Sequence, residues 1–293
     1  LKKIGLLMLP TIFGAAVYQI NILVGTLLAS LLPEGSVSYL YYADRLVQFP
    51  LGIFAIATAT AFLPSISRQA AKKDLQAVRG TFAYAMKLVL FITIPSMVGL
   101  IVLREPIVAL LFKRGAFDAK TTHLTAYALL YYSVGLWAFS AVRIVVSTFY
   151  ALQDTKTPVR MAVISVCANI ILGVVLMGPL GHGGIALATS LASMLNLGLL
   201  VRALKTKLGM LGLKAIMTSA YKTIICSVFM GAAVWAAAPF IMPSEDGSLM
   251  GLFFGLMGSI IIGLVLYGSF SLLLKSRELE KVMVMVRKGK DKA

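Results

Sequence analysis

Apolar segments long enough to cross a lipid bilayer recur along almost the whole chain. A transmembrane helix needs about 20 mainly apolar residues to span the hydrocarbon core. Segments of about that length lie at residues 4–32, 37–63, 82–103, 124–150, 160–178, 185–204, 221–242 and 249–274. Because irregular backbone cannot face lipid, the sequence predicts an all-α membrane protein, a polytopic bundle of eight transmembrane helices.

The composition agrees with a chain surrounded by membrane lipids. Hydrophobic residues make up 59% of the sequence, charged residues only 13%, and the mean hydropathy is +0.92, which is atypical of a soluble domain. The net charge of +16 does not indicate a nucleic-acid partner, because the basic residues lie between apolar segments. Cys167 and Cys226 lie inside apolar segments and are interpreted as small buried side chains. We expect no metal and no cofactor.

Lysine and arginine are concentrated in alternate connections, which is the pattern of cytoplasmic loops. Basic residues occur in the connections 64–81, 151–160 and 202–222 and are absent from 33–36, 179–184 and 243–248. The alternation predicts that both ends of the chain face the cytoplasm.

One connection departs from this alternation. Residues 104–123 should face outward, yet they carry Arg104, Lys113, Arg114 and Lys120. The stretch REPIVALLFKRGAF is typical of a short amphipathic helix that lies along a membrane surface. We therefore predict a surface helix over 104–117 rather than a further span.

No group of residues in the sequence indicates an enzyme. The two histidines, His123 and His182, lie far apart in the sequence, and the chain has no phosphate-binding loop, metalloprotease motif or nucleophile elbow. The glycine-rich stretch GPLGHGGIA at 178–186 follows a span and is interpreted as a tight turn. These observations favour a secondary transporter or flippase over an ATP-driven pump.

Two adjacent charges lie inside the second apolar segment, in YYADRLVQFPLG at 41–52. A charge at bilayer depth costs roughly 2.5–3.5 kcal/mol on insertion scales. Adjacent helix residues point about 100° apart, so Asp44 and Arg45 cannot form a clean ion pair with each other. They need a facing helix, water in a cavity or a ligand. Pro50, one turn later, is expected to bend the helix at a position where transporters often have broken helices.

Other polar residues inside the apolar segments are less specific. Arg143 either extends its side chain to the cytoplasmic interface or contributes to a cavity, and the sequence leaves both readings open. Lys87 is interpreted as a residue that reaches the interface. Asn169, Ser190 and Asn196 are typical of hydrogen bonds between helices.

Three runs resemble one family of membrane proteins. They are SVSYLYYADRLVQFPLGIFAIATATAFLPSISR (36–68), REPIVALLFKRGAF (104–117) and FYALQDTKTPVRMA (149–162), and they resemble the MurJ/MviN lipid II flippases. The resemblance covers the second half of a fourteen-span fold, and a start at Leu1 agrees with a fragment. It implies six spans of a transport lobe in 1–204, two groove-type spans in 205–274 and a basic cytoplasmic tail in 275–293.

The resemblance also implies an activity and a site. Such proteins export the undecaprenyl-pyrophosphate-linked disaccharide pentapeptide across the bacterial cytoplasmic (inner) membrane by alternating access, and cell-wall synthesis proteins are candidate partners. Arg45 matches an arginine of the central cavity, with Asp44 orienting or partly neutralising it, and Arg143 matches a basic residue more loosely. Guanidinium groups suit a pyrophosphate because they bind its oxygens bidentately.

Some expectations remain open. Some relatives bind sodium through acids on their seventh and eleventh spans, but the matching segments here contain none, and only Asn169 stands near such a position. The coupling ion is therefore not predicted. The alternatives to a lipid II flippase are an exporter of another polyprenyl-linked oligosaccharide, such as O-antigen units, and a non-transporting membrane assembly factor.

Overall fold

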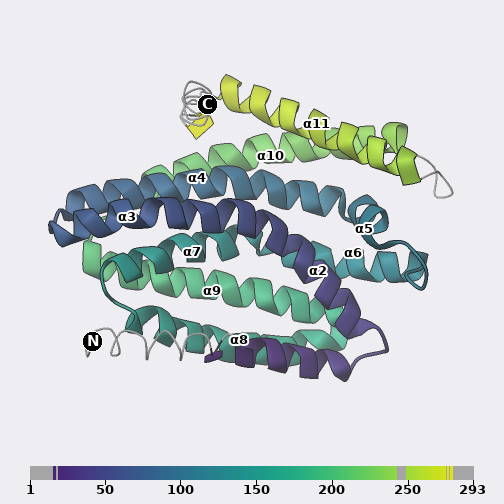
Figure 1. Cartoon of the computed structure of the whole chain (residues 1–293), viewed down its shortest axis with the longest axis horizontal. Coiled ribbons are helices and arrows are strands. Elements are labelled where there is room, and N and C mark those ends of the chain that lie inside the picture. The colour runs from purple at the N-terminus through teal and green to yellow at the C-terminus, as the bar shows by residue number, and fades with distance from the viewer. Residues whose placement is uncertain (1–15, 18, 243–248, 275, 277, 280–293) are drawn as a thin grey trace.

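The computed structural model describes residues 16–17, 19–242, 249–274, 276 and 278–279, and in this part of the chain every regular element is a helix (Figure 1). The first helix covers Gln19–Ser30. The others are α2 (Ser36–Pro50), η1 (Leu51–Ile56), α3 (Ala57–Ala71), α4 (Leu75–Val102), α5 (Arg104–Phe112), α6 (Ala119–Val134), α7 (Leu136–Ala151), α8 (Lys156–Leu180), α9 (His182–Leu208), α10 (Leu213–Ile241) and α11 (Leu249–Leu273).

Six helices are long and apolar enough to cross a membrane. They are α2–η1–α3 taken as one, α4, α8, α9, α10 and α11, and the bent pair α6–α7 adds a seventh if it forms one span. The prediction of an all-α bundle of membrane-spanning helices is thus confirmed. The first predicted segment, 4–32, falls partly outside the described residues, so the number eight stays a prediction.

The connections define two ends of the bundle. The turns at 72–74, 152–155 and 209–212 lie at one end, which we call the basic end because Lys72, Lys73 and Lys156 lie at it. The predicted basic connection 202–222 is wrong in extent, since α9 runs to Leu208 and α10 begins at Leu213, so most of its lysines lie on helix ends. The division between residues 204 and 205 therefore falls inside α9.

The turn at 178–186 and the short helix after α4 are present as predicted. Gly181, with φ +56°, separates α8 from α9. A Cβ on Gly184 would lie 2.1 Å from the carbonyl oxygen of Leu176, so glycine is needed where the two helices touch. Helix α5 has only 9 residues and, at 1.5 Å per residue, cannot span a bilayer. Its place along the outer membrane surface stays a prediction.

Proline changes the second span. Pro50 has no N–H to donate to the carbonyl four residues earlier, and the next six residues, η1, form a π-helix before α3 continues. A π-turn is a recognised way to interrupt the α-helical ladder and often marks a functional position. The expected disturbance at Pro50 is therefore a local change of helix type.

The segment predicted as one span at 124–150 is instead two helices that meet at an angle of 44°. The N–H of Gly135 donates to Tyr132 at 3.1 Å, so the carbonyl of Tyr131 loses its helical donor. The Ser190 hydroxyl of α9 donates to that carbonyl at 2.7 Å. A Cβ on Gly135 would lie 2.5 Å from the Ser190 oxygen. The break depends on this close approach, which a single apolar segment does not reveal.

Helices α10 and α11 lie along one edge of the bundle, beside α4 (Figure 1). Pro95 of α4 cannot donate to the carbonyl of Phe91, and the hydroxyl of Tyr267 on α11 donates to it at 2.6 Å. Both Tyr267 and Phe91 are buried. This hydrogen bond ties the C-terminal helix to the bundle.

We predict that Tyr267→Phe lowers thermal stability, because it leaves the buried Phe91 carbonyl without a donor. The expected cost is roughly 1 kcal/mol, allowing for the modest worth of hydrogen bonds between membrane helices. The measurement is the melting temperature of the purified protein in detergent. Tyr221→Phe on α10, where the side chain is 66% exposed, is the control. Equal melting temperatures for the two variants would contradict the assigned role.

Candidate functional site

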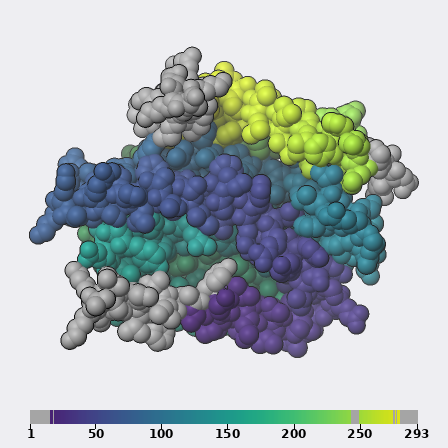
Figure 2. Space-filling view, in the orientation of Figure 1, coloured from purple at the N-terminus to yellow at the C-terminus, as the bar shows by residue number. Residues whose placement is uncertain are grey.

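Helix α2 has one face in the core and an opposite face that carries polar groups. Its buried residues, Ser36, Leu40, Ala43, Val47 and Pro50, recur at helical spacing and face α6. On the other side, the same spacing brings together Tyr41, Asp44, Arg45 and Gln48. We call these four residues the polar face. The α2–η1–α3 segment runs across the surface of the bundle shown in Figure 2.

The two charges of the polar face do not pair with each other, as predicted. The Asp44 carboxylate accepts a hydrogen bond from the Gln48 amide one turn later. The Arg45 guanidinium lies over the ring of Tyr41 one turn earlier, with its carbon 4.9 Å from the ring centroid. We had expected the partner of at least one charge to be a facing helix, water or a ligand. Within the described chain, both partners lie on α2 itself.

A series of aromatic rings packs next to Tyr41 of the polar face. Tyr41 meets the ring of Tyr42 edge-on at 5.8 Å. Tyr42 in turn packs on Phe112 at the end of α5, at 4.8 Å, and on Phe117 at 5.5 Å. The segment 104–117 thus supplies two aromatic rings that pack against Tyr42. The sequence contained these rings but gave no signal that they would meet.

Arg143 lies on a different helix and is exposed. Its helix, α7, packs on η1 and α3, and Ser147, one turn after Arg143, donates to Ala59 of α3 at 3.4 Å. The polar face lies on α2, which packs on α6 instead. The structure does not bring Arg143 and Arg45 into contact, so a shared role for them stays a prediction.

Uncharged polar residues join helices, as the sequence indicated for Ser190 and Asn169. The amide of Asn169 on α8 donates to Asn21 of the first helix at 2.7 Å. For Asn196, a buried side-chain oxygen has no hydrogen-bond partner in the described chain. Within the described residues no group of three or more acids, histidines or cysteines could hold a metal ion.

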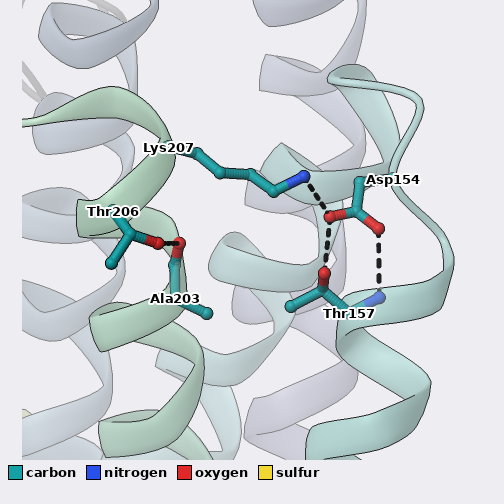
Figure 3. A network of polar contacts seen from close by, with 5 residues as sticks. All are labelled: Asp154, Thr157, Ala203, Thr206 and Lys207. Atoms are coloured by element: carbon teal, nitrogen blue, oxygen red, sulfur yellow. Dashed lines mark hydrogen bonds and ion pairs between the residues drawn. The ribbon is translucent and has the colours of Figure 1, made fainter.

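A network of charged and polar groups connects two helices at the basic end (Figure 3). The Lys207 ammonium of α9 lies 2.5 Å from the Asp154 carboxylate. Asp154 also accepts hydrogen bonds from the Thr157 N–H, at 3.0 Å, and from the Thr157 hydroxyl, at 2.6 Å. Burial raises the pKa of Asp154, but the bonds from Lys207 and Thr157 outweigh it and hold the pKa below its usual value. The carboxylate joins the start of α8 to the end of α9.

The fold is that of a polytopic, all-helical membrane protein. A solved structure entitled "Lipid II flippase MurJ, inward closed conformation" matches with a TM-score of 0.76 and 31% identity, over 91% of this chain and 53% of that one. An outward-facing MATE family transporter of the MOP superfamily matches with a TM-score of 0.62 but only 15% identity, over 96% of this chain and 67% of that one, which shows the fold alone.

The sequence comparisons are more specific. The family model "Lipid II flippase MurJ" matches residues 1–269. A probable lipid II flippase MurJ of Vibrio cholerae is 43% identical over 69% of this chain and 38% of its own length. That of Haemophilus influenzae is 33% identical over 94% of this chain and 55% of its own length.

The chain belongs to the MurJ lipid II flippase family, as the resemblance indicated, and is a multi-pass protein of the cytoplasmic (inner) membrane. It spans about half the length of the curated relatives it matches. The family is one of transporters and not of enzymes.

We predict that Asp154 contributes stability at neutral pH that is lost in acid. Its folded pKa is lowered below that of an unfolded aspartate, so the contribution is fully present above the unfolded pKa and disappears as the pH falls through the folded pKa. The amount should not exceed about 1 kcal/mol, because Lys207 is partly exposed and solvent screens the ion pair. Melting temperatures of wild type and Asp154→Asn, measured between pH 6 and pH 3, should converge at the acid end. Parallel curves would show that Asp154 is not stabilising.

Proposed function

We propose that the full gene product moves lipid II across the cytoplasmic membrane, and that this chain supplies one lobe of the transporter. Membership of the MurJ family supports the activity, and the relatives that match carry the name lipid II flippase. The single observation that carries the site is the polar face of α2, an exposed arginine opposite a buried helix face. An exposed arginine within an apolar, membrane-spanning helix needs an anion or water beside it.

In this proposal Arg45 faces a cavity between two lobes and binds the pyrophosphate of the lipid-linked disaccharide pentapeptide. The guanidinium can meet two phosphate oxygens at once, and low surrounding polarity strengthens the attraction. Asp44 modulates that charge, and Arg143 on α7 is a second candidate contact at another level of the lobe. Alternating access between the lobes would carry the headgroup from the inner to the outer side.

The proposal includes the arrangement in the membrane. Eight spans place both ends in the cytoplasm, with six spans in residues 1–204, two groove-type spans in 205–274 and a basic tail in 275–293. The exposed apolar surfaces of α10 and α11 suit contact with lipid chains. Cell-wall synthesis proteins are proposed partners, since the product of transport is their substrate. No observation favours the O-antigen or assembly-factor alternatives over this assignment.

The topology can be tested by cysteine labelling. Single cysteines at residues 72 and 246 should lie on opposite sides of the membrane, because alternate connections carry the basic residues. The measurement is labelling of whole cells with a membrane-impermeant maleimide, on a background without Cys167 and Cys226. Labelling should occur at 246 and not at 72. The same result at both positions would reject the eight-span arrangement.

We predict that Arg45→Ala abolishes transport while membrane insertion is retained. Loss of one charge-assisted hydrogen bond to an anion that is shielded from water costs roughly 1.5–3 kcal/mol, a ten- to hundredfold loss of affinity. Arg45→Lys should rescue only in part, because an ammonium cannot reproduce the bidentate contact. The measurement is growth of a flippase-depleted cell that carries each variant of the full gene product.

The control for this test is Arg202→Ala, which removes an exposed arginine near the end of α9. It should support growth, since it lies away from the polar face. Protein levels in the membrane are compared by blot for every variant. Normal growth with Arg45→Ala at matched expression would show that Arg45 does not bind the substrate.

A further inference from the structure

The two charged side chains of the polar face contact partners that lie in opposite directions along α2. Gln48 binds the Asp44 carboxylate from one turn toward the basic end, and Tyr41 accepts the Arg45 guanidinium on its ring from one turn toward the opposite end. Both contacts use the i, i+4 spacing at which helix side chains meet. Asp44 and Arg45 are adjacent in sequence, yet each has a partner other than its neighbour.

The two kinds of contact leave Arg45 with its full charge. An aromatic ring attracts a cation through its quadrupole without supplying a negative charge. A carboxylate paired with Arg45 would instead occupy the N–H groups that a phosphate needs. Gln48 binds that carboxylate through a neutral amide, so Asp44 attracts Arg45 electrostatically without forming an ion pair with its N–H groups.

We propose that Tyr41 and Gln48 are positioning residues that hold Arg45 apart from Asp44 and ready for an anion. The inference rests on the proposed function, and it assigns to these two residues the task of keeping the Arg45 guanidinium unpaired. Neither side chain contacts the anion in this assignment, and both act through Asp44 or Arg45.

The surroundings of both residues agree with such a role. Tyr41 is 55% exposed, so it adds little to the core. Its only other ring contact in the described chain is Tyr42, which Phe112 and Phe117 hold in place. The Gln48 amide makes no hydrogen bond to another helix in the described chain. A purely structural role for either residue would require contacts that these side chains do not make.

The first test compares two aromatic residues of the exposed side of α2. Tyr41→Leu removes the ring under Arg45, whereas Phe49→Leu removes a ring that is 69% exposed and does not stack on Arg45. The assay is lipid II transport by the full gene product in liposomes, with the half-saturating concentration and the maximal rate measured separately. Tyr41→Leu should raise the half-saturating concentration about two- to fivefold, while Tyr41→Phe and Phe49→Leu should not. Equal effects of Tyr41→Leu and Phe49→Leu would overturn the role of Tyr41.

The second test uses the coupling between Gln48 and Asp44. Gln48→Leu should free the carboxylate to approach Arg45 and raise the half-saturating concentration about tenfold. Adding Asp44→Asn should restore much of the affinity lost in Gln48→Leu, because the competing charge is gone. A double variant as weak as Gln48→Leu alone would overturn the role of Gln48. Gln48→Met repeats the test if Gln48→Leu does not yield folded protein.

Arg45→Ala in the same liposome assay separates this inference from the proposed function. If Arg45→Ala transports with the maximal rate and half-saturating concentration of the wild type, the proposed function fails at Arg45. If Arg45→Ala loses transport but the Tyr41 and Gln48 variants behave like the wild type, Arg45 binds the substrate without their help, and the positioning inference alone fails. Melting temperatures that match the wild type confirm that each variant is folded.

Discussion

Every backbone carbonyl inside a membrane protein must find its donor within the protein, because lipid supplies none. This chain interrupts helices within its apolar segments, and hydroxyl groups from other helices bind the freed carbonyls at two of the interruptions. The carbonyl four residues before Pro95 accepts from Tyr267 of α11, and the Tyr131 carbonyl before Gly135 accepts from Ser190 of α9. Each repair joins two helices, so each interruption selects the helix that packs against it.

The third interruption, at Pro50 and η1, lies beside the second. Helix α2 packs on α6 and η1 packs on α7, so two neighbouring spans change direction or helix type at adjoining positions. The buried hydrophobic residues of the described chain form four clusters. The two largest lie toward the basic end and toward the opposite end, and Leu51 and Met97 pack against both.

Local signals in the sequence predicted most of the fold. Apolar length located the spans, and glycine at 178–186 located a turn, because both effects act within a few residues. The break at Gly135 could not be predicted, since its cause is Ser190 on another helix. For the site, the separation of Asp44 from Arg45 followed from helix geometry. The i, i+4 rule also allows the contacts with Gln48 and Tyr41 on the same helix, which the expectation of a facing helix, water in a cavity or a ligand did not include.

This chain arranges two combinations of an acidic and a basic residue differently. At the basic end, Asp154 and Lys207 pair directly, and the ion pair joins α8 and α9 although burial of Asp154 opposes its charge. On the polar face, a direct pair between Asp44 and Arg45 would place an opposite charge against the guanidinium. Arg45 instead rests on an aromatic ring, which stabilises the cation and leaves its charge intact. A cation kept in that condition attracts an anion more strongly than one already neutralised, which is the property that the proposed contact of Arg45 with a phosphate requires.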